Sequence, residues 1–294
     1  MQKKIISVHE AHAPHMVGDG LPVRNVFSYN DLGNRELSPF LMLDYGSPVE
    51  FPPTEDALGV GMHPHRGFET VTLAYQGGLE HRDTAGNHGV IGPGDVQWMT
   101  AGSGVLHEEL HSKEFRKTGG TLQMAQLWVN LPAQLKMTAP RYQTLLKTDI
   151  PTIEVQDGKG KIRVVAGSYK DTKGPAHTFT PINLLDVRLA AGADLTLDVP
   201  AGYTTAIVIL DGELTLNDER PLKAFQLAVL ERAGDQFKIG TASSAHLLVL
   251  NGEPINEPVV GYGPFVMNTT DQIHQAIADF RQGRFAASAP SPRG

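Results

Sequence analysis

The sequence contains no cysteine among its 294 residues. This absence excludes disulfide bonds, thiolate metal sites and a cysteine nucleophile, so any bound metal must take nitrogen and oxygen ligands. Long apolar runs are missing too: no stretch of about 18 apolar residues occurs, and the lysines of the N-terminal MQKKIISVHEAHAP are not followed by a hydrophobic segment. We therefore expect a cytoplasmic protein without membrane contact.

Clusters of basic residues are also absent. Lys and Arg number 25 against 32 Asp and Glu, the net charge is −7, and the pI is about 5.9. A nucleic-acid surface needs concentrated positive charge, so direct binding of DNA or RNA is disfavoured. What the chain has in abundance is Gly (31) and Pro (20), at an ordinary hydrophobic content of 40%. This composition favours many turns and short strands and predicts an all-β fold.

The length of the chain is enough for about two domains. Short β-type runs bounded by Gly, Pro and Asp fill both halves. Pro132 ends the last run of the first half, and the pattern restarts at Ile153. We predict two tandem barrels with the following ranges: residues 1–135 for an N-terminal metal-binding barrel, 136–152 for a connector, 153–287 for a C-terminal barrel, and 288–294 for a disordered tail.

One helix is expected near the C-terminus. Thr269 and Gln272 stand three residues apart, as in a capping box, and apolar residues recur at helical spacing over 273–280. Gly283 is a suitable stop signal. We therefore predict an amphipathic helix over 270–283 that packs on a barrel.

The segment from Gly61 to His111 holds two pairs of ligand-type side chains. His63 and His65 form one pair, and His107 and Glu109 form the other. Residues i and i+2 of a β-strand point to the same face, so each pair would project its two side chains together. Three imidazoles and a carboxylate that converge inside a barrel make a divalent-metal site with positions left open for water, dioxygen or substrate. The alternative is surface histidines on a strand and near a turn.

The second half of the chain offers no such set. When the turn Asp211-Gly212 is aligned with the turn at Gly78, the strand that would carry a His-x-His pair reads AGYTTAIVI. His246 stands alone on an apolar run and is interpreted as a hydrogen-bonded core or rim residue. Only the first barrel is therefore expected to bind a metal.

Two blocks of the sequence, HPHRGFETV and GDVQWMTAGSGVLHEE, resemble the pirin family, a branch of the cupin superfamily. The resemblance extends more loosely over the whole chain, through PFLMLDYGSP and GYGPFVMNTTDQIHQAIADFRQGRF. It implies two tandem cupin barrels of jelly-roll type, of which only the N-terminal one keeps a metal. Carried over to this sequence, the pirin ligands are His63, His65, His107 and Glu109. A germin-like H-x-H-x3-E motif would instead use Glu69, but the longer pirin match and the pairing with His107 favour Glu109.

The resemblance also implies a function. The ligand set suits Fe(II), with Mn, Ni, Cu, Co or Zn as alternatives. Because proteins resembling pirin include bacterial quercetin 2,3-dioxygenases, we expect a flavonol-like substrate and dioxygen, with Glu109 as the proton acceptor. Phe68, Trp98 and Met99 are candidates for the pocket wall. Other pirins are iron-dependent binding proteins that act on a protein partner, which is the alternative function. The sequence leaves monomer or homodimer open.

Overall fold

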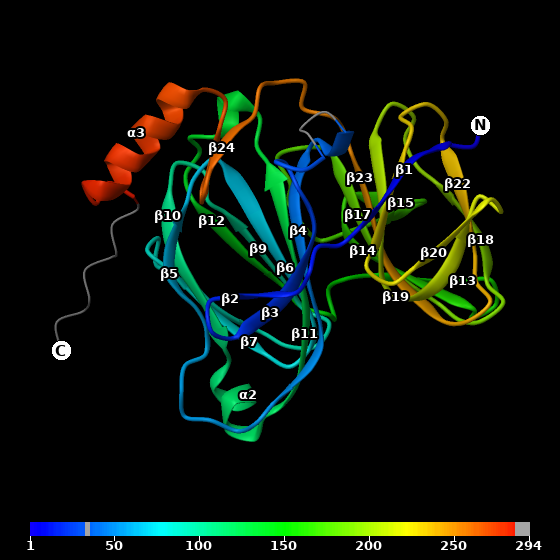
Figure 1. The fold of residues 1–294 in the computed structure, drawn as a ribbon, viewed down its shortest axis with the longest axis horizontal. Coiled ribbons are helices and arrows are strands. Elements are labelled where there is room, and N and C mark those ends of the chain that lie inside the picture. The colour runs from blue at the N-terminus through cyan, green and yellow to red at the C-terminus, as the bar shows by residue number, and fades with distance from the viewer. Residues whose placement is uncertain (33–35, 286–294) are drawn as a thin grey trace. The chain divides into compact units, whose positions relative to one another are not determined.

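The computed structural model describes residues 1–32 and 36–285 (Figure 1). Within these residues strands dominate and helices are few and short, which confirms the prediction of an all-β fold with a C-terminal helix. The predicted disordered tail, 288–294, lies outside the described residues. Among the described residues, none of the helices has the length and apolar character that a membrane span requires.

Contacts divide the chain into two compact units whose sequence ranges interleave. The first, here called the aliphatic unit, contains Met1–Ala13, Arg24–Met42 and Thr148–Pro254. The second, here called the histidine unit, contains Pro14–Val23, Leu43–Lys147 and the described residues from Ile255 on. The domains expected from the sequence are consecutive ranges, and their boundaries stay a prediction.

Two antiparallel sheets carry the histidine unit. Their strands are β2 (His15–Val17), β3 (Leu21–Ser28), β4 (Phe40–Phe51), β5 (Gly59–His65), β6 (Phe68–Gln76), β7 (Leu79–Asp83), β8 (His88–Ile91), β9 (Val96–Thr100), β10 (Val105–His111), β11 (Gly120–Asn130) and β12 (Arg141–Leu145). The smaller sheet has the order β5-β10-β7-β8, and the larger has the order β12-β9-β6-β11-β4-β3-β2. In the larger sheet, residues 24–28 of β3 and 40–42 of β4 are counted with the aliphatic unit. Side chains of the two sheets meet inside the unit, where Glu109 of β10 is hydrogen-bonded to Gln97 of β9.

The sequence of β10, VLHEELH, has the alternation on which the site prediction depends. Val105, His107, Glu109 and His111 are buried, and the residues between them are half-buried. Glu108 therefore points away from the interior, as expected for a strand. Because β10 pairs with β5 on one side and with β7 on the other, the inward side chains of three strands lie together.

Strand β12 lies inside the segment 136–152 that the sequence indicated as a connector. It pairs with β9, with Tyr142 opposite Met99. Among its described residues, the short helices of this unit are α2 (Lys113–Thr118), capped by Ser112, and η1 (Ala133–Leu135), one turn of 3-10 helix. None of these three elements was expected from the sequence.

The C-terminal helix α3 (Thr270–Arg281) begins as the sequence predicts. The Thr269 hydroxyl accepts the backbone N–H of Gln272, and the Gln272 side chain accepts the backbone N–H of Thr269, which completes the capping box. The helix buries Ile273 and Ala276 in a small apolar cluster with the hairpin of β24 (Val260–Tyr262) and β25 (Phe265–Met267). The helix and this hairpin belong to the histidine unit.

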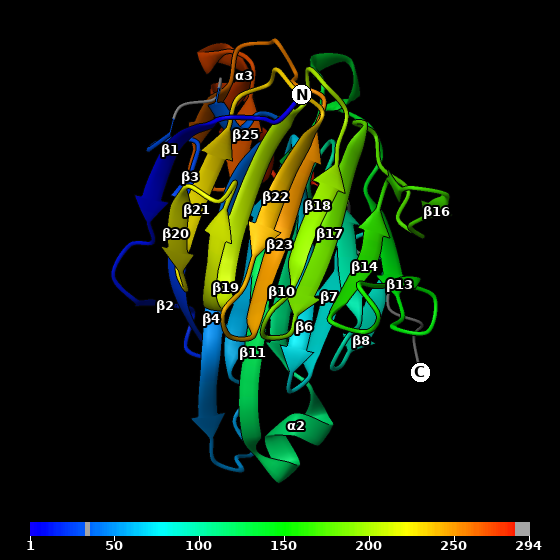
Figure 2. The ribbon, with the colours of Figure 1, turned by 90° about the vertical axis from the view of Figure 1, so that its right-hand side faces the viewer.

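The aliphatic unit is organised around one ten-stranded sheet. Its main path is β1-β21-β19-β23-β17-β14-β13, and β18, β20 and β22 pair off that path. The strands are β1 (Ile5–Glu10), β13 (Thr152–Val155), β14 (Gly160–Ala166), β17 (Ile182–Leu189), β18 (Asp194–Asp198), β19 (Thr204–Leu216), β20 (Arg220–Lys223), β21 (Gln226–Leu230), β22 (Gln236–Gly240) and β23 (Ala245–Gly252), with a separate pair β15 (Ser168–Tyr169) and β16 (Thr172–Lys173). Figure 2 shows β19, β23 and β17 running alongside one another.

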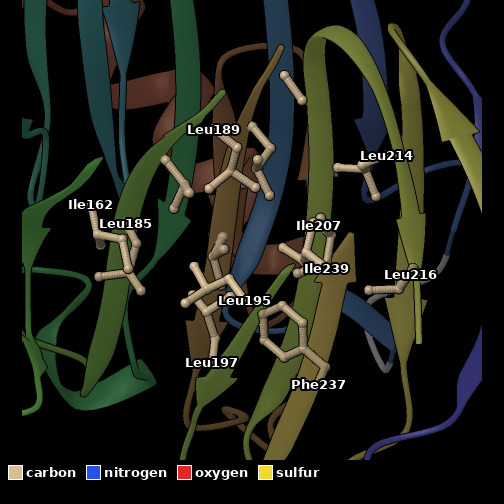
Figure 3. Close-up of a cluster of buried hydrophobic side chains, with 14 of the residues drawn as sticks. Ile162, Leu185, Leu189, Leu195, Leu197, Ile207, Leu214, Leu216, Phe237 and Ile239 are labelled. Atoms are coloured by element: carbon tan, nitrogen blue, oxygen red, sulfur yellow. The ribbon is translucent and has the colours of Figure 1, made fainter. Parts of the chain in front are cut away.

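Apolar side chains fill the interior of the aliphatic unit. Figure 3 shows Leu195, Leu197, Ile207, Phe237 and Ile239 directed into one cluster, and all of them are buried. Alternation along β18 and β22 supplies four of these residues, because every second position is apolar, and Ile207 comes from β19. The interior of this unit is therefore a packed aliphatic core.

His246 agrees with its interpretation as a hydrogen-bonded residue. Its Nε2 lies 2.6 Å from the Asp186 carboxylate, which also accepts a hydrogen bond from Arg163 at 2.8 Å. Within residues 1–32 and 36–285, no group of three or more gathered ligand-type side chains includes a residue of the aliphatic unit.

Candidate metal centre

Three histidines meet where β5 pairs with β10. In the register of this pair, His107 lies opposite His63, and Val105 lies opposite His65. The ring centroids of His63 and His107 are 4.2 Å apart, and those of His65 and His107 are 4.8 Å apart. One nitrogen from each of the three rings can be chosen so that all lie within 4.8 Å of one another. The structure thus brings together the three histidines that the two sequence pairs contain.

Hydrogen bonds leave a free nitrogen on each of the two β5 rings. The Nδ1 atom of His63 lies 2.8 Å from the Gly61 carbonyl oxygen, and Nδ1 of His65 lies 3.4 Å from that of Pro264. A carbonyl oxygen only accepts, so in each ring Nδ1 donates and the lone pair resides on Nε2. Pro264 belongs to the segment before β25, so this segment orients the His65 ring of β5.

Burial keeps two of the three rings uncharged. It lowers the pKa of His65 to about 3, with the nearby His63 acting in the same direction. Burial likewise lowers the pKa of His107 well below its usual value, and the neighbouring rings lower it further. Neutral imidazole is the form that binds metal ions.

The Nε2 atom of His107 gives the clearest test of whether the three rings suit a metal ion. It is buried, and no hydrogen-bond partner reaches it. Leaving a buried polar atom unsatisfied costs about 1–3 kcal/mol. A cation placed among the three rings would satisfy this atom and the two Nε2 lone pairs of β5, so the residues present fit a divalent metal ion.

Glu109 lies in the same interior but bonds to polar side chains of the opposite sheet. Its Oε1 accepts from Gln97 Nε2 at 3.0 Å and lies 2.8 Å from Thr72 Oγ1, and its Oε2 accepts from Gln126 Nε2 at 3.1 Å. The carboxylate is not part of the group of gathered histidine nitrogens. Three polar partners of the larger sheet thus orient the carboxylate of Glu109, and its role as a ligand stays a prediction.

Glu69 lies on the face of β6 opposite to that of Thr72, the residue that contacts Glu109. The register pairs Glu69 with Thr100 and Thr72 with Gln97, and residues directly opposite in antiparallel strands share a face. Since Thr72 and Gln97 contact Glu109, Glu69 and Thr100 must face away from the histidines, and Thr100 Oγ1 donates to Glu69 at 2.7 Å. Burial raises the pKa of Glu69 to about 7, against the hydrogen bond from Thr100. The geometry therefore favours Glu109 over Glu69 as the carboxylate of the site.

The raised pKa of Glu69 predicts a pH-dependent stability. The folded protein binds this proton more tightly than the unfolded chain, so the contribution of Glu69 to stability falls as the pH rises from about 4.5 through 7. The loss is about 3 kcal/mol at 1.36 kcal/mol per pK unit. Glu69→Gln mimics the protonated form and should be more stable than the wild type by about this amount near pH 8, with little difference near pH 4.5. Urea unfolding at both pH values measures it, with the exposed Glu55→Gln as control. If the stability of Glu69→Gln depended on pH just as that of the wild type does, the pKa of Glu69 would not be the one that burial raises.

Next to His107 lies a pair of polar residues on β7 that the sequence did not single out. His81 and Asp83 are neighbours on one face of β7, and His81 lies opposite Glu109 in the register with β10. His81 Nδ1 is 3.4 Å from His107 Nδ1, and His81 Nε2 is 3.3 Å from Asp83 Oδ2. Burial alone would raise the pKa of Asp83, but hydrogen bonds from His81 and Asn87 outweigh it and lower the pKa. His81 and Asp83 have the same i,i+2 spacing as the pairs His63/His65 and His107/Glu109. That spacing is the sequence signal from which this pair could have been predicted.

Aromatic rings border the histidines on one side. The ring of His65 is 5.1 Å from Phe68 and 5.2 Å from Trp128, measured between centroids. Trp128 is half-buried and was not expected at the site. Trp98 lies opposite Val71, on the face of the sheet that points away from the histidines. The expectation that Trp98 forms part of the pocket wall is therefore wrong. Met99 faces inward and packs with Val105 and Tyr142.

Comparisons with known proteins agree with this architecture. Two family models match the chain: Pirin over residues 20–129 and the Pirin C-terminal cupin domain over residues 184–286. A Pseudomonas aeruginosa protein with the provisional name quercetin 2,3-dioxygenase is 54% identical over 283 residues, which cover 96% of this chain and 98% of that protein.

Solved structures match over most of the chain as well. A crystal structure of quercetin 2,3-dioxygenase from Acinetobacter baumannii has a TM-score of 0.96 and 50% identity, covering 98% of this chain and 100% of that one. The bacterial pirin from Escherichia coli in complex with nickel(II) has a TM-score of 0.64 at 20% identity, covering 84% of this chain and 100% of that one, and shows the fold alone. With matches of this identity and coverage, and with a cupin domain in each half, the chain belongs to the pirin family.

Proposed function

We propose that this protein is a metal-dependent dioxygenase of the pirin type that acts on quercetin or a similar flavonol. The observation that carries the proposal is the group formed by His63, His65 and His107, whose ligand nitrogens gather within 4.8 Å. The names of relatives at 54% and 50% identity support the flavonol and dioxygen as reactants.

The proposed ion is Fe(II), held by His63, His65, His107 and Glu109. Three imidazoles and one carboxylate are borderline and hard donors, which suit iron and also Mn, Ni, Cu, Co or Zn. A bound divalent ion supplies Lewis acidity, which lowers the pKa of a coordinated hydroxyl group and orients it.

Glu109 is proposed to receive the proton of the flavonol hydroxyl. Its carboxylate offers about four lone-pair positions. Thr72, Gln97 and Gln126 occupy up to three of them and are all uncharged, so they orient the carboxylate without protonating it. The Thr72 hydroxyl has one proton and lies 2.7 Å from Gln126 Oε1 as well, so it can release Glu109 by turning to this second acceptor.

The aromatic side of the site is proposed to hold the flavonol rings. Phe68 and Trp128 lie against each other with ring centroids 4.3 Å apart, and both border His65. Because Trp128 is only half-buried, part of its ring is open to a planar ligand. Stacking of this kind contributes about 0.5–1.5 kcal/mol beyond the apolar area that it buries.

A turnover assay tests the proposal directly. Metal-free protein is loaded with Fe(II) without oxygen, mixed with quercetin in aerated buffer, and followed by loss of flavonol absorbance and by oxygen uptake. We expect turnover by the wild type and none by His63→Ala, because that variant lacks one of the three gathered rings. His88→Ala is the matched control, since His88 is an exposed histidine of β8 whose Nε2 contacts Glu80.

A negative result has a defined meaning in this assay. Wild-type protein that is shown to carry one iron per chain but consumes neither quercetin nor oxygen would overturn the dioxygenase proposal. The metal centre would then serve the alternative function, an iron-dependent binding protein.

A further inference from the structure

A chain of hydrogen bonds leads from the candidate metal centre into the smaller sheet. His107 Nδ1 contacts His81 Nδ1 at 3.4 Å, and His81 Nε2 contacts Asp83 Oδ2 at 3.3 Å. The side chains of His81 and Asp83 are each 1% exposed. All three residues come from the adjacent strands β7 and β10. The contacts are therefore shielded from water, and each donor and acceptor must be matched within the chain.

The direction of each hydrogen bond follows from the far end of this chain. The Asp83 carboxylate accepts the backbone N–H groups of Ala85 at 3.0 Å and Asn87 at 2.9 Å, and the Asn87 amide donates to it too. With these donors already directed at it, the carboxylate acts as an acceptor, so His81 Nε2 must be the donor. A neutral His81 then has its lone pair on Nδ1, where it can only accept a hydrogen bond from the Nδ1–H group of His107.

We propose that His81, oriented by Asp83, is a positioning residue that holds His107 as its Nδ1–H tautomer and so directs the Nε2 lone pair at the metal ion. The inference deepens the proposed metal centre and rests on it for its consequence in ion binding. It also accounts for the buried and unpartnered Nε2 of His107, because that nitrogen carries a lone pair in this tautomer. In the opposite tautomer a proton would occupy Nε2 and block coordination.

The packing around His81 suits a positioning role. Its ring stacks on Tyr142 with centroids 4.6 Å apart and an interplanar angle of 23°. The Tyr142 hydroxyl donates to Gln97 Oε1 at 3.1 Å, and Gln97 Nε2 donates to Glu109. Strand β12, which supplies Tyr142, thus supports both His81 and the hydrogen-bond partner of the proposed carboxylate ligand. Partners of this kind orient metal-binding histidines, and their loss weakens ion binding by about 10- to 100-fold.

The tautomers can be measured without a metal. Long-range ¹H–¹⁵N correlation spectra of the metal-free wild type near pH 8 distinguish a protonated from an unprotonated ring nitrogen. We expect His107 to carry its proton on Nδ1 and His81 on Nε2. Finding His107 protonated at Nε2 would overturn the proposal, whatever the protein binds.

Ion binding by variants measures the consequence. His81→Phe keeps a ring to stack on Tyr142 but removes the acceptor, so its affinity for nickel(II), measured by calorimetry, should fall about 10- to 100-fold. His81→Asn can place its amide oxygen near the former Nδ1 and should regain most of that loss. The control is His88→Asn, which removes an exposed imidazole of β8 and should bind as the wild type does.

The two proposals fail in different ways in these experiments. Wild-type protein that binds no nickel(II) or iron(II) would remove the metal centre itself. Wild-type protein that binds the ion, together with a His81→Phe variant of equal affinity, would remove the role of His81 and leave the metal centre in place. A merely structural His81 would predict that the Phe and Asn variants weaken binding equally, which would also overturn the proposal.

Discussion

Loading the protein with a divalent ion should raise its free energy of unfolding by about 4 kcal/mol when the free ion stands about a thousandfold above its dissociation constant. His107→Leu should abolish this gain. In the wild type, three nitrogens gathered within 4.8 Å become ligands on folding, whereas the unfolded chain has no preformed site. Without His107 only two imidazoles remain, and the ion no longer favours the folded state.

The metal-free form of this variant should behave differently. Leu removes the buried Nε2 that has no partner, which favours folding, but it also leaves Nδ1 of His81 without a donor. The two effects are each about 1–3 kcal/mol and oppose each other, so metal-free His107→Leu should be close to the wild type in stability. Thermal unfolding with nickel(II) and with chelator measures both states, and His88→Asn should keep the full gain. An ion-dependent shift of equal size in His107→Leu would show that the ion binds elsewhere.

The sequence predicted the central strands of the site because their information is local. Alternation in VLHEELH is enough to direct His107 and Glu109 to one face, and the structure has that pattern of burial. The capping box at Thr269 is likewise a short-range signal, and helix α3 begins there. The family resemblance added the pairing of two segments that lie more than 40 residues apart in the chain, which alternation alone does not supply.

What the sequence did not reveal depends on pairing between distant segments. Nothing in LEHRD distinguishes a strand from a polar loop until β7 is placed beside β10, and only then does His81 reach His107. The orientation of Glu69 and Trp98 required the register of β6 with β9. Strand β12 has a polar sequence, RYQTL, and pairs only with β9 at the edge of its sheet. The contact of His65 with Pro264 joins residues 199 positions apart, and no periodic pattern records it.

A buried lysine close to the candidate metal centre was also beyond the reach of sequence patterns. Lys136 is 1% exposed and follows the turn η1. Its ammonium group donates to the Gly67 carbonyl at 2.8 Å, to Asn130 Oδ1 at 2.7 Å and to the Val266 carbonyl at 3.0 Å. These three acceptors lie after β5, at the end of β11 and in β25. The three N–H donors of one lysine therefore join the histidine strand to the hairpin that supplies Pro264.

Lys136→Met should destabilise the protein by about 4 kcal/mol, because it preserves the aliphatic stem but leaves three buried acceptors without their donor. Burial lowers the pKa of Lys136 to about 7, so chemical unfolding near pH 6, where the ammonium form predominates, measures the loss. The exposed Lys113→Met on α2 should stay within about 0.5 kcal/mol of the wild type. The change should also weaken nickel(II) binding. Gly67 lies two residues from His65 and Val266 two residues from Pro264, and the contact between His65 and Pro264 orients the His65 ring. A Lys136→Met variant as stable as the wild type would mean that water replaces the ammonium group. In that case β5 and β25 are held together mainly by other contacts, such as the backbone hydrogen bonds of Arg66 with Pro264 and Val266.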